Sequence, residues 1–419
     1  LYLVGGTRFE LATPTMSRQC LAAHIARELF DCAAKAGNSE HKRTHFINLP
    51  EIVLAQARAI ALGTYQPQAL TVFAVTDPKL REIFAPTPSD RLVHQWLVRH
   101  IEPWWNPRFI DDSFANRKGT QAPADRLQHF MRQPGHKWYC KLDIRAFFPS
   151  IDRAILRQLW DKALPKLPHD KATRQRLNQV VLAILAQNPI DPPPAFSGQW
   201  QLLKQVPPHK SLFHTAPAKG LPIGSLSSQF FANVDLHELD HVIKHTLKVR
   251  GYVRYVDDFV LLADSAEALI AQRKAIDVFL RDHLALKVHP HKTAMQRCTQ
   301  GLDCLDAIVY PHHKLTRQRS VRALRRRLAG FTQMVFAQGR PGTGSLAWAA
   351  GGRRTRRVAT LVDQPHRLLC ARCANTRAAA KTAGHPEQLL RHVQPRQHLA
   401  PAQTYLRGGA WLFAPVLYS

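Results

Sequence analysis

The chain has 419 residues, of which 45% are hydrophobic and 21% charged, which is enough apolar material for a sizeable core and excludes disorder throughout. Lysine and arginine number 58 against 30 acidic residues, giving a formal net charge of +28. A surplus this large favours a polyanionic partner. No apolar run approaches the roughly 20 residues of a membrane span, so no membrane partner is expected. Seven cysteines, an odd number, do not indicate a secreted disulfide framework, and a reducing cytoplasm is expected.

The two ends of the chain show weaker signals. Only Leu1–Val4 is apolar in the opening stretch, which is too short for a signal-peptide core of roughly 7–15 residues. Met16 is a more natural start, so residues 1–15 are interpreted as a non-native or disordered edge. Near the other end, Cys370 and Cys373 form one CxxC without a second clear pair, and free thiols are expected there in preference to zinc.

Sequence patterns predict elements of both kinds along the chain. Helices are expected within 16–70, and a mixture of short strands and helices over 71–138. A strand running into a turn follows over 139–150, then a helix at about Ile151–Trp160 and a proline-rich loop over 187–219. Residues 220–312 are expected to form a glycine turn, a helix, a hairpin, a second helix and further strands. This mixture predicts an α+β fold and argues against a bundle or a sandwich.

The last quarter of the chain is strongly basic. Residues 307–419 hold 19 lysines and arginines but only two acids. Within it, an apolar stripe at three-four spacing predicts a helix, made by Val321, Leu324, Leu328 and Phe331. Other faces of this helix carry Arg322, Arg325 and Arg326. A solvated charged face is the simpler interpretation, but without nearby acids we expect the stripe to pack inward and the arginines to lie along phosphates.

Two segments place carboxylates in apolar strands. Asp143 lies in the β-type run Tyr139–Ile144, where an unpaired carboxylate costs free energy unless it is paired or binds a metal. Asp257 and Asp258 lie at the tip of an expected hairpin with strands Tyr252–Tyr255 and Phe259–Ala263. Adjacent carboxylates repel unless a cation lies between them.

These carboxylates suit magnesium chemistry if the fold brings them together. Two Mg²⁺ ions roughly 3.5–4 Å apart serve in-line phosphoryl transfer. Magnesium often takes only one or two protein carboxylates and completes its shell with substrate phosphates. A solvated hairpin turn is the simpler interpretation of an Asp-Asp pair, but the apolar strands, the matching Asp143 strand and the basic chain argue against it.

Seven segments in order resemble the motifs of a reverse transcriptase, an RNA-directed DNA polymerase. They are KLREIFAPTPSDRLVHQWLV, FIDDSFANRKGTQAPADRLQ, KLDIRAFFPSI, GLPIGSLSSQFFANVDLHELD, YVRYVDD, LALKVHPHKT and GLDCLDAIVY, and they cover residues 79–310. The resemblance implies a right-hand polymerase with fingers, a palm containing an antiparallel sheet, and a helical thumb. The implied divisions are 16–138 for N-terminal helices and fingers, 139–312 for the palm with a fingers-side insertion at about 161–219, and 313–419 for the basic thumb and tail.

The resemblance also implies roles for individual residues. Asp143 and Asp257 would bind two Mg²⁺ ions, with Mn²⁺ as a substitute, assisted by the Ile144 carbonyl and supported by Asp258. Lys292 would donate a proton to pyrophosphate. The residues that would contact the incoming dNTP are Arg81, Arg117, Lys118, Phe148, Gly224 and Gln229, with Phe148 excluding a ribose 2′-hydroxyl. Generic surface charge, core packing and turn glycines are the simpler interpretations of these residues.

Within this class the chain is most similar to the reverse transcriptases of diversity-generating retroelements. Most relatives carry glutamine at the position of Ile223 and proline at that of Gln229, whereas isoleucine with Ser-Gln is typical of this branch. Gly224–Ser227 reads GSLS where the branch more often has Gly-Asn-Leu-Thr. An isoleucine at 223 lacks the amide that could bond the nucleotide or template, which predicts low fidelity, especially at template adenines.

The implied partners are an RNA template, the RNA–DNA hybrid, dNTPs and a small basic accessory variability protein that forms a multimer. The implied location is the cytoplasm of a bacterium, with a bacterial or phage-encoded gene. Two alternatives stay open: a defence-associated bacterial reverse transcriptase, and a polymerase-like RNA-binding scaffold without catalysis. The three aspartates argue against the scaffold.

Overall fold

The computed structural model describes residues 18–34, 48–77, 79–114, 119 and 121–337. Residues 1–15, Arg117, Lys118 and the Cys370–Cys373 motif lie outside the described residues. The chain divides into two compact units between Val321 and Arg322, and each is described by itself. Among the described residues, no helix is both long and apolar enough to cross a bilayer.

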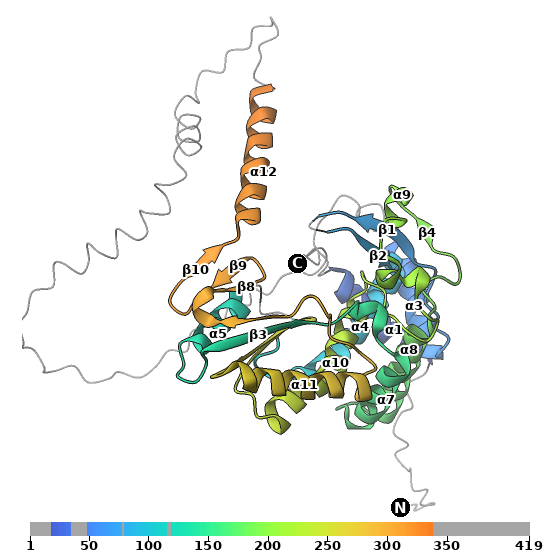
Figure 1. Cartoon of the computed structure of the whole chain (residues 1–419). Coiled ribbons are helices and arrows are strands. Elements are labelled where there is room, and N and C mark those ends of the chain that lie inside the picture. The colour runs from blue at the N-terminus through green and yellow to red at the C-terminus, as the bar shows by residue number, and fades with distance from the viewer. Residues whose placement is uncertain (1–17, 35–47, 78, 115–118, 120, 338–419) are drawn as a thin grey trace, which may run out of the picture. The chain divides into compact units, whose positions relative to one another are not determined.

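Helices and strands are interspersed along the described chain (Figure 1). The α-helices are α1 (Arg18–Ala34), α3 (Leu49–Leu62), α4 (Pro88–Trp105), α5 (Gln121–Met131), α6 (Phe147–Ser150), α7 (Arg153–Ala163), α8 (Lys171–Ala186), α9 (Trp200–Leu203), α10 (Leu226–His241), α11 (Ala266–His283) and α12 (Gln318–Ala337). The strands are β1 (Thr71–Val75), β2 (Arg81–Ala85), β3 (Trp138–Asp143), β4 (Ala195–Phe196), β5 (Gly251–Tyr255), β6 (Asp258–Ala263), β7 (Ala294–Arg297), β8 (Leu302–Cys304), β9 (Ala307–Val309) and β10 (Lys314–Thr316).

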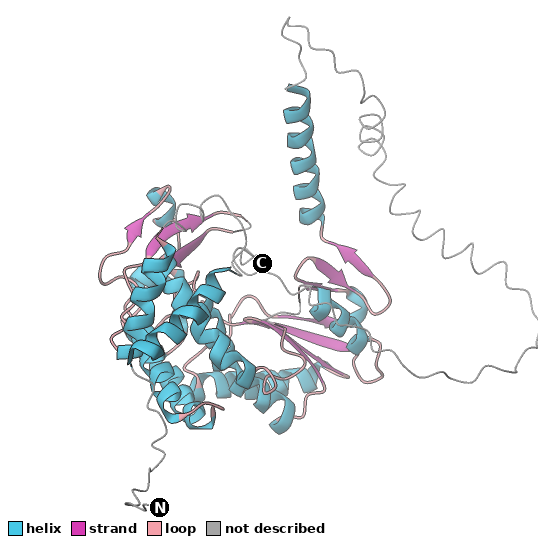
Figure 2. Ribbon diagram, turned by 180° about the vertical axis from the view of Figure 1, so that it is seen from behind, coloured by secondary structure: helices cyan, strands magenta, loops and turns pink. Residues whose placement is uncertain are grey.

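A four-stranded antiparallel sheet in the order β5-β6-β3-β7 lies at the centre of the first unit. Alternate residues of β3 point to opposite faces of the sheet, as strand geometry requires. Cys140 and Leu142 belong to the large core shared with α10 and α11, whereas Tyr139 packs with α5 and the β8–β9 hairpin. The sheet is therefore covered on both faces (Figure 2).

A smaller sheet in the order β2-β1-β4 lies beside the N-terminal helices. Strands β1 and β2 form an antiparallel hairpin, and the short β4 adds to β1 in parallel. Helices α1, α3 and α4 pack on one another and contribute to the same core as α7 and α10. Helix α4 begins sharply because the Thr87 side chain caps the Asp90 amide and Pro88 occupies its first turn.

Most of the expected elements are present, with shifted boundaries. The strand expected at Tyr139–Ile144 is β3, one residue earlier, and Ile144 forms an isolated bridge with Val288 instead. The helix expected from Ile151 begins at Arg153, because Asp152 is its N-cap. The loop over 187–219 is interrupted by short pieces such as β4 and α9. The assignment of fingers, palm and thumb boundaries stays a prediction.

Helix α12 forms where its pattern predicts it, but its apolar stripe is not buried. Leu324, Leu328 and Phe331 are 58%, 48% and 60% exposed, so the inward packing expected for this stripe is wrong for the described residues. Periodicity predicts a helix and its apolar face, but it does not identify a surface that covers that face.

Candidate active site

Asp143 and Asp258 stand directly opposite each other on neighbouring strands. The register of β3 and β6 pairs them as the last partners of the ladder, after Leu142 and Phe259. Directly opposed residues of an antiparallel pair have Cα atoms roughly 4.5–5.5 Å apart. Two predicted aspartates, far apart in sequence, are therefore brought together at one end of the sheet.

The third aspartate lies in the turn between β5 and β6. Tyr255 pairs with Asp258, which leaves Val256 and Asp257 as the turn itself. Val256 has a φ of 53°, in the left-handed region that a β-branched residue seldom adopts. This unusual turn places the Asp257 carboxylate beside Asp258 and close enough to Asp143 for their charges to interact.

The charged forms of these carboxylates are disfavoured unless a positive charge lies nearby. Burial, together with the negative charges of Asp258 and Asp143, raises the pKa of Asp257 to about 7. Burial also raises the pKa of Asp258, although Lys141 opposes this shift. A cation between the carboxylates would relieve both the lost hydration and the repulsion.

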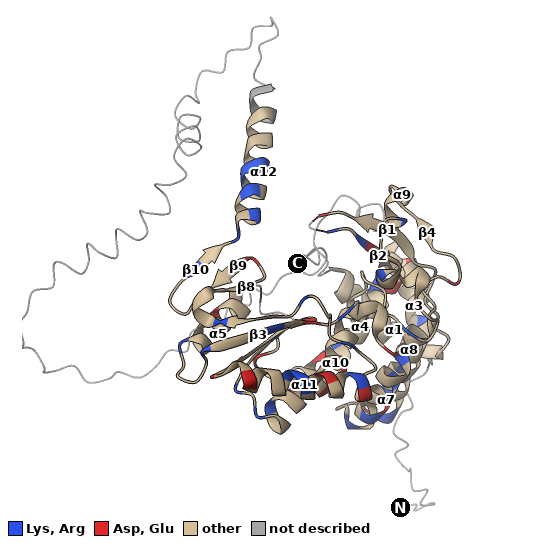
Figure 3. Ribbon diagram, viewed as in Figure 1, with Lys and Arg blue, Asp and Glu red and all other residues tan. Residues whose placement is uncertain are grey.

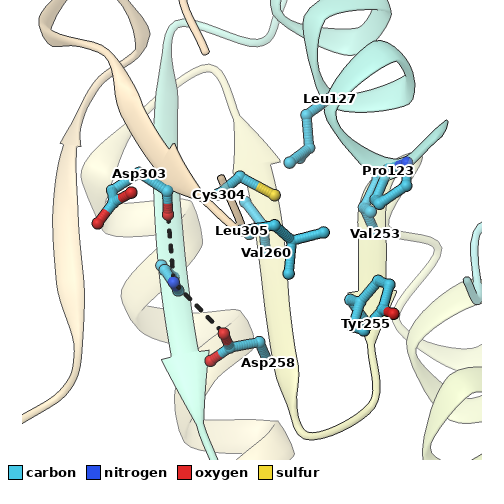
Figure 4. Close-up of a pocket in the computed structure, with 10 residues that line it drawn as sticks. Pro123, Leu127, Val253, Tyr255, Asp258, Val260, Asp303, Cys304 and Leu305 are labelled. Atoms are coloured by element: carbon cyan, nitrogen blue, oxygen red, sulfur yellow. Dashed lines mark hydrogen bonds and ion pairs between the residues drawn. The ribbon is translucent and has the colours of Figure 1, made fainter. Parts of the chain in front are cut away.

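Two lysines already approach the carboxylates from other elements. Lys292, in the segment before β7, donates to the Asp143 carboxylate. Lys141, on β3, lies 3.5 Å from Asp258 Oδ2 and donates to the carbonyl of Asp303 on β8 at 3.2 Å (Figure 4). Lys141 therefore ties Asp258 to the β8–β9 hairpin, a role that the sequence did not reveal.

Further cations gather near Asp143 and Asp257. Burial and the positive charges of Lys292, Arg81 and Lys210 lower the pKa of Lys79, which places these three side chains within electrostatic reach of Lys79. Arg81 lies on β2 and also interacts with Asp257. The group suits a multiply charged anion such as a triphosphate. Of these residues only Arg81 and Lys292 were predicted from the sequence.

The fit of a metal to this site rests on the carboxylates themselves. No group of three His, Cys, Asp or Glu side chains in the described part of the chain has a geometry that could hold an ion. The arrangement therefore is not a closed protein cage. It fits Mg²⁺ held by one or two carboxylates with substrate phosphates as the remaining ligands, because carboxylate oxygens are the donors that this ion prefers.

Of the residues predicted to contact the nucleotide or to set fidelity, Ile223 and Gly224 border β2. Ile223 accepts a bond of 2.7 Å from the Phe84 amide, and Gly224, with a φ of 124°, lies so close that a Cβ would be 2.9 Å from the Phe84 carbonyl. Glycine is thus required there by packing within the chain itself. Gln229 is half-buried on α10, and its carbonyl accepts from Asn233.

Phe148 and its neighbour Phe147 differ in burial. Phe147 is buried in the core, whereas Phe148 is half-buried and meets it edge to face at 5.5 Å. The Phe148 carbonyl accepts from the Leu221 amide at 2.9 Å, so this residue is tied to the segment that contains Ile223.

A buried polar cluster fixes the start of α10 against α4. Ser225 Oγ lies 2.8 Å from His94 Nδ1 and 2.8 Å from Ser227 Oγ. Burial lowers the pKa of His94 to about 4, so the ring is neutral near pH 7 and serves as a hydrogen-bonding group. The sequence contained no signal for this contact, because the partners lie far apart in the chain.

The predicted basic residues of the last helix are all exposed. Arg322, Arg325 and Arg326 lie on α12, which has no acidic residue along its length (Figure 3). The predicted Arg117 and Lys118 lie outside the described residues.

The chain is similar to a known protein family and to individual known proteins. The reverse transcriptase (RNA-dependent DNA polymerase) family matches residues 76–324. Protein YkfC of Escherichia coli (strain K12) is 22% identical over 303 residues, covering 62% of this chain and 69% of YkfC. The group II intron-encoded protein LtrA of Lactococcus lactis subsp. cremoris is 21% identical over 340 residues, covering 65% of this chain and 52% of LtrA. The chain thus spans about half the length of LtrA.

Similar solved structures include two telomerases. The telomerase of Candida albicans in complex with a TWJ fragment of telomeric RNA has a TM-score of 0.42 at 11% identity, covering 65% of this chain and 51% of its own. The apo telomerase of Candida tropicalis, truncated from its C-terminal domain, has a TM-score of 0.43 at 10% identity, covering 60% and 56%. The family match extends over more than half of the sequence and includes every aspartate of the site, and on that ground the chain belongs to the reverse transcriptase family.

Proposed function

We propose that the chain makes cDNA from an RNA template by nucleotidyl transfer at Asp143 and Asp257, using two Mg²⁺ ions, with Mn²⁺ as a substitute. The observation that carries the proposal is the register that sets Asp143 opposite Asp258, with Asp257 in the adjoining turn. Three cations support it, because Lys79 and Lys292 interact with Asp143 and Arg81 interacts with Asp257, beside the place where a triphosphate would lie. Lys210 lies within electrostatic reach of Lys79.

The aspartates divide the work of the site. Asp143 and Asp257 would hold the ions, assisted by the Ile144 carbonyl, while Asp258, next to Lys141, would support the turn. When bound, the ions would supply acidity to the primer 3′-hydroxyl and neutralise the leaving pyrophosphate. Lys292 would be released from Asp143 as positive charge reaches that carboxylate, and its ammonium would then be able to protonate pyrophosphate.

The neighbouring elements would position the nucleotide. Lys79, Arg81 and Lys210, with the predicted Arg117 and Lys118, would bind the triphosphate. Phe148 would lie against the sugar and exclude a 2′-hydroxyl, and Gly224 and Gln229 would border the base pair. The support for these roles is that Phe148 is bonded through its backbone to the segment leading to Gly224.

The test is primer extension on an RNA template by the full chain and its Asp257→Asn variant. We expect Mg²⁺-dependent incorporation of dNTPs by the wild type and a loss of about 1000-fold in the variant, because the site loses several kcal/mol of transition-state stabilisation and each ~1.4 kcal/mol is tenfold in rate. Asp264→Asn is the matched control, since Asp264 follows the other end of β6 and is 61% exposed. Near-normal extension by Asp257→Asn would refute the assignment and leave a non-catalytic RNA-binding scaffold as the remaining interpretation.

We further propose that the enzyme belongs to a diversity-generating retroelement and copies its template with low fidelity. The support is Ile223, whose carbonyl is bonded to β2 and whose side chain offers no amide to the nucleotide or template. Sequencing cDNA made by the wild type and by Ile223→Gln tests this. Fewer errors in the variant, chiefly opposite adenines, are expected. Identical error spectra would remove the support, and a defence-associated reverse transcriptase would then be the better assignment.

The proposed partners follow from charge and from the family. The exposed arginines of α12 would contact the phosphates of an RNA–DNA hybrid without reading its sequence. A multimeric basic accessory variability protein and a cytoplasmic location in a bacterium stay predictions.

A further inference from the structure

We propose that Arg254 and Asp240 form a buried positioning pair that sets the turn bearing Asp257. The inference deepens the proposed function and rests on it for its catalytic consequence. Neither residue touches the reacting atoms, and the pair would act through the backbone of the turn. The observation behind it is the set of contacts that the Arg254 guanidinium makes.

The guanidinium of Arg254 is fully buried, as is the Asp240 carboxylate. Arg254 Nε donates to Asp240 Oδ1 at 2.8 Å and Nη2 donates to Oδ2 at 2.6 Å, a bidentate pair. Its remaining nitrogen, Nη1, donates to Asn233 Oδ1 at 3.1 Å and to the carbonyl of Val256 at 3.0 Å. Tyr252 completes the group by donating to Asp240 Oδ1 at 2.6 Å.

The bond to the Val256 carbonyl holds the peptide that precedes Asp257. Val256 adopts a left-handed backbone conformation, which a β-branched residue maintains only when its surroundings compel it. Arg254 supplies such a constraint from within the same hairpin. Releasing that carbonyl would let Val256 return to a relaxed conformation and would turn the Asp257 carboxylate away from Asp143.

The backbone of Arg254 is held on both sides as well. On one side Arg254 pairs with Phe259 of β6. On the other side its amide donates to the Asp112 carbonyl, and its carbonyl accepts from the Phe114 amide, each at 2.9 Å. The side chain that anchors the turn therefore starts from a strand that cannot shift by itself.

Simple stabilisation of the fold is a weaker explanation. Removing two charges from water costs about as much as their attraction returns, so a buried pair adds little net stability over an apolar replacement. An apolar replacement could not make the directed hydrogen bonds by which the Arg254–Asp240 pair fixes the position of the turn. A pair on α10 and β5 that reaches the turn of the site fits a positioning task.

The test compares the full chain with Arg254→Lys and with the double variant Arg254→Gln/Asp240→Asn. The lysine keeps the charge opposite Asp240 but has no fork that reaches Asp240 and Val256 together. The double variant removes both charges, avoids an unpaired buried ion, and leaves an acceptor for the Tyr252 hydroxyl. Arg157→Gln is the matched control, because Arg157 forms an exposed ion pair with Asp161 on α7.

Thermal unfolding, Mn²⁺ binding in the presence of primer-template and dNTP followed by electron paramagnetic resonance, and primer extension are measured on each protein. We expect both test variants to fold, to bind Mn²⁺ about 10- to 100-fold more weakly, and to lose about 100-fold in kcat, with KM for dNTP changed less than about twofold. The control should match the wild type in all three measurements.

Two results would overturn the positioning pair: a folded double variant with wild-type Mn²⁺ affinity, or a folded Arg254→Lys with wild-type Mn²⁺ affinity. If the double variant does not fold, Arg254→Lys alone decides. A wild type that binds Mn²⁺ but extends no primer would sink the proposed function, and the Mn²⁺ comparison would still decide the inference, so the two failures are distinguishable.

Discussion

The aspartates of the four-stranded sheet and the arginines of α12 stand in opposite surroundings. Asp143 is 7% exposed and meets Lys292, and Asp258 meets Lys141. The arginines of α12 are exposed, on a helix whose apolar stripe is exposed too. The acids are thus positioned by the protein before any ligand arrives.

The difference follows from the cost of burying charge. A carboxylate removed from water requires a nearby cation or hydrogen bonds, so its neighbours must be built into the fold. An exposed arginine remains hydrated and takes its geometry from the phosphate that it binds. Substitutions in the sheet should therefore change the rate of chemistry, whereas substitutions on α12 should change affinity and its salt dependence.

The largest effect is expected within the sheet, where the comparison of Asp143→Asn with Asp258→Asn sharpens the division of roles. Asp143→Asn should lower the rate of single-nucleotide incorporation by about 1000-fold, because it removes a proposed metal ligand. Asp258→Asn should cost only about tenfold, since Lys141 holds this carboxylate in a supporting position. Rapid-quench kinetics at saturating Mg²⁺ measures both. Equal losses would mean that Asp258 is a full ligand.

A smaller effect is expected on α12. Replacing Arg322, Arg325 and Arg326 by glutamine should lower the slope of log affinity against log salt by about two to three units, because up to three phosphate contacts are lost. Binding of an RNA–DNA hybrid is measured by fluorescence anisotropy across salt concentrations. Arg273→Gln/Arg281→Gln on α11 is the control, since those arginines pair with Asp277 and Asp282. An unchanged slope would mean that these arginines do not contact phosphates, and the proposed contrast between the sheet and α12 would then be wrong.

A third effect, on stability and not on catalysis or binding, concerns the buried acid Asp235. Neither carboxylate oxygen of Asp235 has a hydrogen-bond partner within the described structure, and burial, with the nearby charge of Asp152, raises its pKa to about 8. In the unfolded chain this pKa is about 3.9, so the wild type should lose stability as pH rises from about 4 to about 8. Asp235→Asn escapes this loss, which should reach on the order of a few kcal/mol.

Melting temperatures of the two proteins, measured from pH 4.5 to pH 9, check this expectation. The difference between them should grow up to about pH 8 and then level off. A constant difference over the whole range would mean that Asp235 titrates normally in the folded protein. Either result shows whether burial without hydrogen bonds is enough to keep this acid protonated near neutral pH.

Much of the site could be predicted because its signal is local. A carboxylate inside an apolar strand and a pair at a hairpin tip are visible in single segments, and the motif order implied the α+β right-hand polymerase fold that the family match confirms. The pairing of Asp143 with Asp258 was not among the predictions, because Asp258 was expected at the hairpin tip and instead begins β6.

The rest depends on register between distant segments. Lys141 and Arg254 look like ordinary charged residues of strands, and only the fold shows that one reaches Asp258 and the other Asp240. In the same way, only the fold shows that Lys79 and Lys210 lie within electrostatic reach of each other. For α12 the local pattern predicted the helix, but burial of a stripe requires a partner surface, which periodicity does not encode.

The central strand β3 has a consequence for how the enzyme matures. It pairs with β6 on one side and with β7 on the other, so Trp138 finds its second partner only at Arg297. Contacts between segments so remote in sequence form slowly, because a long loop must close first. During synthesis, Asp143 would remain apart from Asp257 and Asp258 until β6 has been made, and the sheet would be complete only after β7 has followed.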